Sequence, residues 1–296
     1  MNRQVIIDTD PGLDDAVAIL FALGSGRFDI LGLTTVAGNI GLERSTRNAG
    51  GLLALAGRGD IPVIAGAAEA MLRTNIDALV VHGSDGLRGV TLPDPVSPAK
   101  DDAVTWLADT LRSAPIGSID LLALGPLTNI GKLINDHPDA AARIGRLIAM
   151  GGAINEPGNA GPASEFNFAS DPEATAIVFR AALKTTIIPL DVTRRLRADV
   201  AYVDGLRGTL LGDTAADLLI AYMTDGKVSR PLHDPCVMLL ALAPDLFDIE
   251  MHRLSVDLRD GPDAGTLTKR EAGQPVAIAM RVQAQRALDL LASGFR

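Results

Sequence analysis

The chain has 296 residues, of which 47% are hydrophobic and only 3% aromatic, and its formal net charge at pH 7 is −9. This length and apolar content suit a soluble α/β protein, and because the sequence contains no repeat or linker we expect a single domain over residues 1–296. The acidic balance, without a block of basic residues, makes nucleic acid and membranes poor partners. The charge-free stretches, among them residues 16–26, 30–42 and 121–131, are shorter than the roughly 18 residues that span a bilayer.

Two features bear on the cellular compartment. The sequence runs from Met-Asn-Arg directly into a strand-like segment, without the apolar run and small-residue cleavage site of a signal peptide. Cys236 is the only cysteine, so a disulfide framework is excluded. We therefore expect a cytoplasmic protein.

Short apolar runs alternate with segments of helical periodicity up to residue 190. Strands are predicted at 5–9, 31–36, 62–65, 119–124, 146–150 and 185–190, and helices at 14–23, 44–56, 101–112, 127–135 and 172–182. This alternation predicts an α/β fold with a largely parallel central sheet flanked by helices. Beyond residue 190, helices at 214–224, 235–243 and 283–291 and extended segments at 249–258 and 276–281 predict a small antiparallel addition.

An acidic motif follows the first predicted strand. Asp8, Asp10, Asp14 and Asp15 place four carboxylates within eight residues, where they repel one another. Helix capping accounts for Asp14 as the N-cap and for Asp15 near the helix dipole. It leaves Asp8 and Asp10 unexplained, at the carboxyl end of a strand where α/β sheets bind ligands. A hard cation with oxygen ligands, Ca²⁺ or Mg²⁺, would neutralise the group.

The motif D-T-D-P-G-L-D-D-A-V-A-I at 8–19 closely resembles the N-terminal signature of the inosine–uridine nucleoside hydrolase family. Further blocks match in order: Val-Ala-Gly-Asn at 36–39, His-Gly-Ser-Asp-Gly at 82–86, Leu-Gly-Pro-Leu-Thr-Asn at 124–129, Met-Gly-Gly at 150–152, Asn159, Glu-Phe-Asn at 165–167 and His-Asp-Pro at 233–235. The resemblance extends from residue 3 to about 290. It implies a Rossmann-like nucleoside hydrolase fold and cleavage of the N-glycosidic bond of purine and pyrimidine ribonucleosides into base and ribose.

The resemblance also implies a metal site. The expected ion is Ca²⁺, held by Asp10, Asp15, Asp234 and the backbone carbonyl of Leu124, with ribose hydroxyls and a water completing the shell. Family members often have Thr at position 124, an exchange that a main-chain ligand tolerates. By the same analogy the ribose lies among polar side chains and one methionine: Asp14, Asn39, Met150, Asn159, Glu165, Asn167 and Asp234.

Breaking the bond through an oxocarbenium-like state requires an activated water and help for the departing base. Asp10 is the candidate general base, because a carboxylate beside a metal-bound water can take its proton. His233 is the candidate acid, with an ordinary pKa near ~6.5. His82 is expected near the base, although a hydrogen-bonded structural histidine is the alternative. His137 and His252 receive no function.

Two departures from the family pattern leave the preferred base open. Segment 222–232 is short and has Tyr222 as its only aromatic residue, where many members supply several base-contacting side chains. Arg194 and Arg195 stand where a histidine is frequent, and a solvated surface pair is the simpler interpretation.

Two other classes of protein remain as alternatives. A haloacid-dehalogenase-like phosphatase also has D-x-D after its first strand, but that motif continues with Gly-Thr rather than Pro-Gly. A nucleoside-binding or ribose-binding protein without turnover would retain the same pocket. For the enzyme, the family analogy implies a homodimer or homotetramer.

Overall fold

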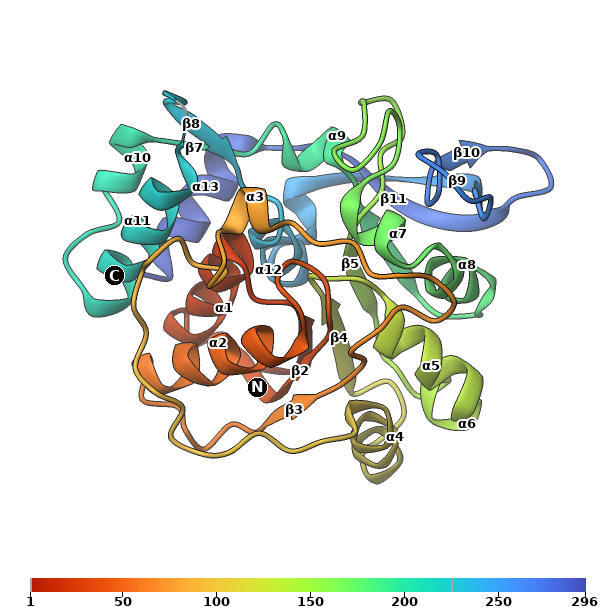
Figure 1. The fold of residues 1–296 in the computed structure, drawn as a ribbon, viewed down its shortest axis with the longest axis horizontal. Coiled ribbons are helices and arrows are strands. Elements are labelled where there is room, and N and C mark those ends of the chain that lie inside the picture. The colour runs from red at the N-terminus through yellow and green to blue at the C-terminus, as the bar shows by residue number, and fades with distance from the viewer. Residues whose placement is uncertain (1, 225) are drawn as a thin grey trace.

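A nine-stranded sheet crosses the computed structural model, which describes residues 2–224 and 226–296 (Figure 1). Its strands are, in spatial order, β10 (Leu267–Lys269), β9 (Phe247–Val256), β11 (Gln274–Val282), β6 (Thr185–Ile188), β5 (Leu147–Met150), β4 (Ile119–Ala123), β1 (Arg3–Thr9), β2 (Phe28–Thr35) and β3 (Val63–Ala65). Strands β1 to β6 and β11 run parallel, whereas β9 and β10 add antiparallel pairs. The predicted parallel sheet with a small antiparallel addition is confirmed.

Successive side chains of each buried strand point to opposite faces of the sheet. Both faces are therefore apolar, and helices cover both. Val5 and Ile7 join one core and Ile6 joins the other. The first core is completed by α1 (Leu13–Gly24), α2 (Leu42–Leu55), α11 (Leu210–Tyr222), α12 (Pro235–Leu242) and α13 (Ala284–Ser293). The second is completed by α4 (Ala103–Ser113), α5 (Thr128–Asp136), α6 (Pro138–Ala141) and α8 (Pro172–Arg180).

In the order β3-β2-β1-β4-β5-β6, β2 and β3 are added on one side of β1 and β4 to β6 on the other, so the order of addition switches between β1 and β4. At such a switch point the two chains leave the sheet on opposite sides and open a crevice at the carboxyl ends of the strands. The backbone N–H of Leu124, just after β4, donates to the Asp8 carbonyl at 2.8 Å. This bond fixes the exit of β4 beside the acidic motif that follows β1.

Several predicted details are corrected. Helix α1 begins at Leu13 with Gly12 as its N-cap, so Asp14 lies within the first turn and is not the cap. Strand β6 ends at Ile188, since Pro189 cannot donate a ladder hydrogen bond, and α9 (Leu190–Thr193) follows. The sequence also missed a two-stranded sheet of β7 (Arg197–Asp199) and β8 (Ser229–Pro231).

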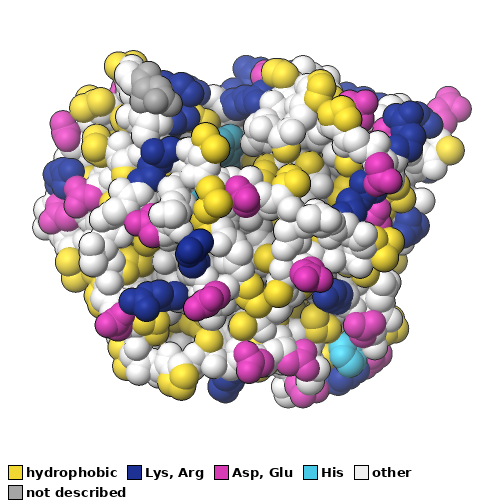
Figure 2. Space-filling model, in the orientation of Figure 1, with side chains coloured by type: hydrophobic (Ala, Val, Ile, Leu, Met, Phe, Trp, Pro, Cys, Tyr) yellow, Lys and Arg dark blue, Asp and Glu magenta, His cyan; other side chains and the backbone are white. Residues whose placement is uncertain are grey.

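Short helices were missed as well: α3 (Leu79–His82), α7 (Phe166–Ser170) and α10 (Val200–Asp204). Within the described ranges no helix is long and apolar enough to cross a membrane. Basic and acidic side chains are interspersed over the face drawn in Figure 2.

Candidate active site

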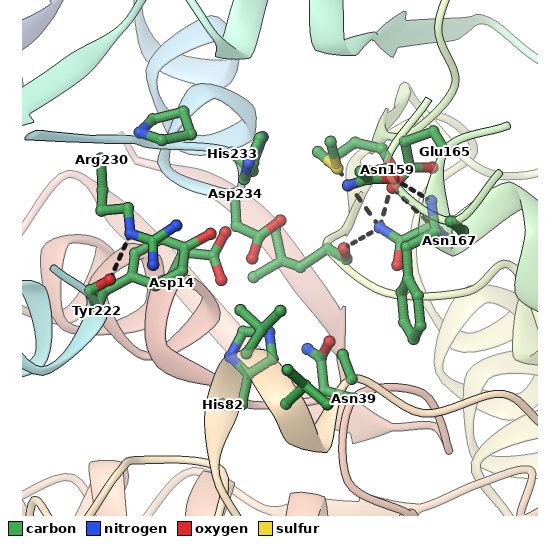
Figure 3. Close-up of a pocket in the computed structure, with 18 of the residues that line it drawn as sticks. Asp14, Asn39, His82, Asn159, Glu165, Asn167, Tyr222, Arg230, His233 and Asp234 are labelled. Carbon is green, nitrogen blue, oxygen red and sulfur yellow. Dashed lines mark hydrogen bonds between the residues drawn. The ribbon is translucent and has the colours of Figure 1, made fainter. Parts of the chain in front are cut away.

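A pocket of about 750 Å³ lies at the switch point of the sheet. Its lining includes Asp14, Asn39, His82, Leu124, Met150, Asn159, Glu165, Phe166, Asn167, Arg194, Arg197, Tyr222, Lys227, Arg230, His233 and Asp234. All of the residues predicted to bind the ribose are in this set, whereas Asp10 and Asp15 lie behind the lining. The close-up in Figure 3 shows Asp14 and Asp234 near its centre, with His82 and Asn39 on one side and His233 on another.

Three buried carboxylates form an acidic cluster in this pocket. One oxygen from each of Asp14, Asp15 and Asp234 lies within 4.8 Å of the other two. Asp14 and Asp15 occupy the first turn of α1, and Asp234 directly precedes α12. The partial positive charge of these helix ends offsets part of the negative charge. The cluster can hold a divalent cation, because carboxylate oxygens are the ligands that hard cations prefer.

Burial and repulsion from neighbouring carboxylates disfavour ionisation of Asp10, Asp14 and Asp234. Burial, followed by the charge of Asp15, raises the pKa of Asp14 to about 7. Burial and then the neighbouring charges raise the pKa of Asp10 and that of Asp234 well above their ordinary values. A cation favours the ionised forms, so the arrangement is one that a bound metal ion would stabilise.

Asp10 adjoins the cluster and has one unsatisfied oxygen. Its Oδ2 accepts a hydrogen bond from the backbone N–H of Asn39 at 2.7 Å. Its Oδ1 is buried and has no hydrogen-bond partner among the described residues. Asp15, by contrast, accepts hydrogen bonds from the Thr9 hydroxyl at 2.7 Å and from the Gly12 N–H at 3.1 Å. A buried oxygen left unpaired points to a missing ligand or water, which fits the residues to a metal centre.

Amide and carboxylate groups form a second wall. Asn167 Nδ2 donates to the Leu124 carbonyl at 2.6 Å and to the Met150 carbonyl at 3.2 Å, which ties the ends of β4 and β5 together. Glu165 caps α7 and accepts the N–H groups of Asn167 at 3.0 Å and Gly152 at 3.0 Å. Burial raises the pKa of Glu165, against the lowering effect of these hydrogen bonds.

Asn159 lies on an exposed loop at the rim of this wall. Its Oδ1 accepts a hydrogen bond from the Phe166 N–H at 2.8 Å, which joins the loop to the start of α7. The side chain therefore reaches the pocket from a segment that solvent can approach.

His82 and Tyr222 line the opposite side (Figure 3). His82 Nδ1 accepts a hydrogen bond from the Leu13 N–H at 3.0 Å, which leaves the ring proton on Nε2. Burial lowers the pKa of His82 to about 4. The Tyr222 ring stacks on His82 with centroids 6.2 Å apart, and the Arg230 guanidinium lies 4.7 Å from the centroid of the Tyr222 ring.

His233 departs from its expected titration. Its Nδ1 lies 2.7 Å from the Thr193 hydroxyl. Burial, followed by the charge of Arg194 and weaker effects from other cations, lowers the pKa of His233 to about 3 rather than leaving it near its ordinary value. The imidazole is therefore neutral at neutral pH in the bare site.

Two expectations about the lining are corrected. Arg194 is not a solvated surface residue, because it lines the pocket and donates to the carbonyls of Pro157 at 2.7 Å and Gly158 at 3.1 Å. Segment 222–232 is not featureless, since Tyr222, Lys227 and Arg230 face the pocket. The overlooked signal was Lys227 and Arg230, which closely precede the His-Asp-Pro block.

Comparison with known proteins agrees with this geometry. The model of the inosine-uridine preferring nucleoside hydrolase family matches residues 5–289. The pyrimidine-specific ribonucleoside hydrolase RihA of Salmonella arizonae is 40% identical over 256 residues, which cover 83% of this chain and 82% of the relative.

Solved structures give the same answer. A plant nucleoside hydrolase, PpNRh1, is 31% identical in sequence and superposes with a TM-score of 0.88. The match covers 100% of this chain and 99% of the plant enzyme. A purine-preferring ribonucleoside hydrolase from Gardnerella vaginalis is 28% identical with a TM-score of 0.91, over 99% and 98% of the two chains. The protein belongs to the inosine–uridine preferring nucleoside hydrolase family and is an enzyme that hydrolyses N-glycosyl bonds.

Proposed function

We propose that the protein is a Ca²⁺-dependent hydrolase that converts purine and pyrimidine ribonucleosides into free base and ribose. The observation that carries the proposal is the convergence of Asp14, Asp15 and Asp234 within 4.8 Å at the switch point of the sheet. Polar groups suited to a polyhydroxylated ring, Glu165 and Asn167, line the same pocket. The alternative hypothesis of a phosphatase gives no role to Glu165 and Asn167.

The proposed metal ligands are Asp10, Asp15, Asp234 and the Leu124 carbonyl. Asp15 and Asp234 belong to the close triad, whose third member is Asp14, and the charge of Asp15 acts on Asp10 beside it. All are hard oxygen donors, and the Leu124 carbonyl retains a lone pair after accepting its bond from Asn167. When bound, Ca²⁺ would supply positive charge that acidifies a ligated water and orients the ribose hydroxyls.

The chain's own groups would carry the remaining chemistry. Asp10 would accept the proton of the attacking water through its unpaired Oδ1. The buried carboxylates would stabilise the positive charge that develops on the ribose ring at the oxocarbenium-like state. Asn167 and Glu165, held by backbone contacts, would orient the sugar. His233 and His82 would face the base as neutral imidazoles able to donate or accept a hydrogen bond.

The proposed specificity for the nucleobase is broad. One relative is named pyrimidine-specific and one structural neighbour purine-preferring, so membership of the family does not fix the base. A pocket of about 750 Å³ has room for either ring system beside a ribose.

A nucleoside panel assayed for released ribose tests the proposal. Inosine and uridine should both be hydrolysed, and activity should vanish on chelation and return with Ca²⁺. The 2′-deoxynucleosides should be much poorer substrates, because the lost hydroxyl leaves buried partners unpaired. Binding of inosine without ribose release would identify a binding protein instead, and release of phosphate from esters alone would identify a phosphatase.

A further inference from the structure

Three basic residues that line the pocket of this acidic protein, Arg197, Lys227 and Arg230, lie on or next to the paired strands β7 and β8. A fourth, Arg194, also lines the pocket but is bonded to the loop that carries Asn159, and the chain as a whole carries a net charge of −9. In Figure 2, Lys and Arg side chains lie along the upper edge of the drawn face, where Figure 1 places β7 and β8. Among the described residues, Asp77 is the one carboxylate that lines the pocket away from the acidic cluster and Glu165.

Three of these cations form no ion pair with any carboxylate of the described residues. Arg197 donates to the side chain and carbonyl of Ser229, at 3.1 and 2.9 Å. Arg230 donates to the Tyr222 carbonyl and to the Thr224 hydroxyl. Over residues 2–224 and 226–296, neither arginine nor Lys227 forms an ion pair, whereas Arg194 lies 3.3 Å from a Glu156 oxygen. Hydrogen bonds to neutral groups position these side chains without cancelling their charge.

The location of the cations matches the end that would receive the base. The acidic cluster and the wall of Glu165 and Asn167 would hold the ribose, as proposed above. In Figure 3 Tyr222 and Arg230 lie across the pocket from Asn159, Glu165 and Asn167. A base projecting from the sugar away from that amide wall therefore approaches the aromatic ring of Tyr222 and the positive charges beside it.

We propose that this basic end selects ribonucleosides whose base bears a negative charge, specifically pyrimidines with a carboxylate on the ring edge remote from the ribose. The inference rests on the proposed hydrolase function and names a substrate class for the same site. A carboxylate there would meet Arg197, Lys227 and Arg230 while staying clear of the acidic cluster that holds the sugar. Arg230 is half-buried whereas Arg197 and Lys227 are exposed, so the attraction between opposite charges acts partly through solvent and depends on salt.

The same cations would assist the departing base. The C1′–N bond breaks with its electron pair on the base nitrogen, and the oxygen of water bonds to C1′. The proton that water gives up passes to Asp10 and from there, through solvent, to the released base. Positive charge beside the ring stabilises the anion until that proton arrives.

The test compares two uridines that differ in charge at C5, 5-carboxyuridine and its neutral 5-carboxamide. The measured quantity is the ratio of kcat/KM for the carboxylate to that for the amide. We expect this ratio to fall about tenfold in R197Q, in K227Q and in R230Q, the loss of one close charge–charge contact. R230K should restore most of it, because the charge is kept. R44Q, which removes an exposed arginine outside the pocket, is the matched control and should leave the ratio unchanged.

The outcomes separate the two proposals. If wild-type protein hydrolyses uridine but the ratio is the same in R44Q and in all three pocket variants, the selectivity for an anionic base is refuted and the hydrolase function stands. K227Q still tests the proposal if R230Q fails to fold, because Lys227 is exposed and its replacement should leave the fold intact. If wild-type protein releases ribose from none of the ribonucleosides, the proposed function fails and this inference with it.

Discussion

Asp10 differs from Asp8 in the charges around it, because the carboxylates of Asp15 and Asp14 add to burial in raising the pKa of Asp10. Asn39 fixes one oxygen, and the other is buried without a partner among the described residues. Asp8 is buried too, with Oδ1 accepting hydrogen bonds from the Thr34 hydroxyl at 2.5 Å and from Asn129 Nδ2 at 2.8 Å and with Oδ2 likewise unpartnered, but burial rather than a neighbouring charge raises its pKa. The two carboxylates therefore have different proposed roles, one chemical and one architectural.

The first prediction follows from this difference. D10N keeps the size of the side chain but removes its basicity, so kcat for inosine should fall about 10²–10⁴-fold, the usual range for a general base. The thermal unfolding midpoint should change little. D8N is the control in the same motif and should retain most of the activity. Near-normal turnover in D10N would reject Asp10 as the base.

A second prediction concerns His233, which hydrogen-bonds with Thr193. Natural bases leave poorly without a hydrogen-bond donor, whereas p-nitrophenolate leaves unaided. H233A should therefore reduce kcat/KM for inosine about 10²-fold or more while affecting p-nitrophenyl riboside far less. T193V should show a weaker form of the same discrimination, because the ring loses the bond that orients it. Equal losses on both substrates would mean that His233 positions the sugar or Asp234.

At the level of elements, the turn after β4 packs directly on Asp10. A Cβ added to Gly125 would overlap Asp10 Oδ1, and one added to Gly38 after β2 would overlap Oδ2. Two loops thus clamp one carboxylate from both sides, and neither glycine has a positive φ. Their small size, rather than their backbone freedom, is what the site uses.

The third prediction tests this clamp. G125A should displace the Asp10 carboxylate and lower kcat at least about tenfold, since small misplacements of a reacting group are costly. The affinity for Ca²⁺, measured by calorimetry, should fall in parallel. G205A is the control, because its new Cβ would lie 3.3 Å from the nearest atom, the Tyr202 carbonyl oxygen, at a φ of −70°. Wild-type kinetics in G125A would show that the loop yields without moving Asp10.

The long elements could be predicted from the sequence because their patterns are local. Strand β1 alternates between two cores, and α8 begins with Asp171 as N-cap and Pro172 in its first turn. The pairing of β7 with β8 could not be predicted, because strands of three residues carry no periodicity and the two strands lie about thirty residues apart in the sequence.

The predictability of the site has the same limit. Residues inside recognisable blocks, such as Asn167 and Asp234, could be assigned to one pocket by resemblance. The sequence could not show which carboxylates of the first motif lie closest to Asp234, since Asp10 and Asp14 differ only by their positions around a turn. Arg197 and Arg230 belong to no motif, and only the pairing of β7 with β8 brings them to the pocket.

On the scale of the whole molecule, the acidic cluster brings together two helices that lie far apart in the sequence. Asp14 and Asp15 lie on α1 near the N-terminus and Asp234 precedes α12, more than two hundred residues later. Helices α1 and α12 pack in the same core, so the cluster adds repulsion at a contact that hydrophobic burial holds together. The cation that is proposed to bind here would therefore stabilise the global fold as well as take part in catalysis.

The last prediction measures that coupling. A ligand that binds only the folded state at about 100 times its Kd adds about 2.7 kcal/mol to the free energy of unfolding. For a chain of this size, Ca²⁺ should therefore raise the Tm of chelator-treated protein by about 5 °C or more. D234N should act in opposite directions on the two forms: the metal-free Tm rises slightly, because one repulsive charge is gone, and the shift produced by Ca²⁺ shrinks because a ligand is lost. Calorimetric scans of both proteins, with chelator and with Ca²⁺, give all four values. Identical Tm values for the wild type under the two conditions would show that no Ca²⁺ bridges α1 and α12.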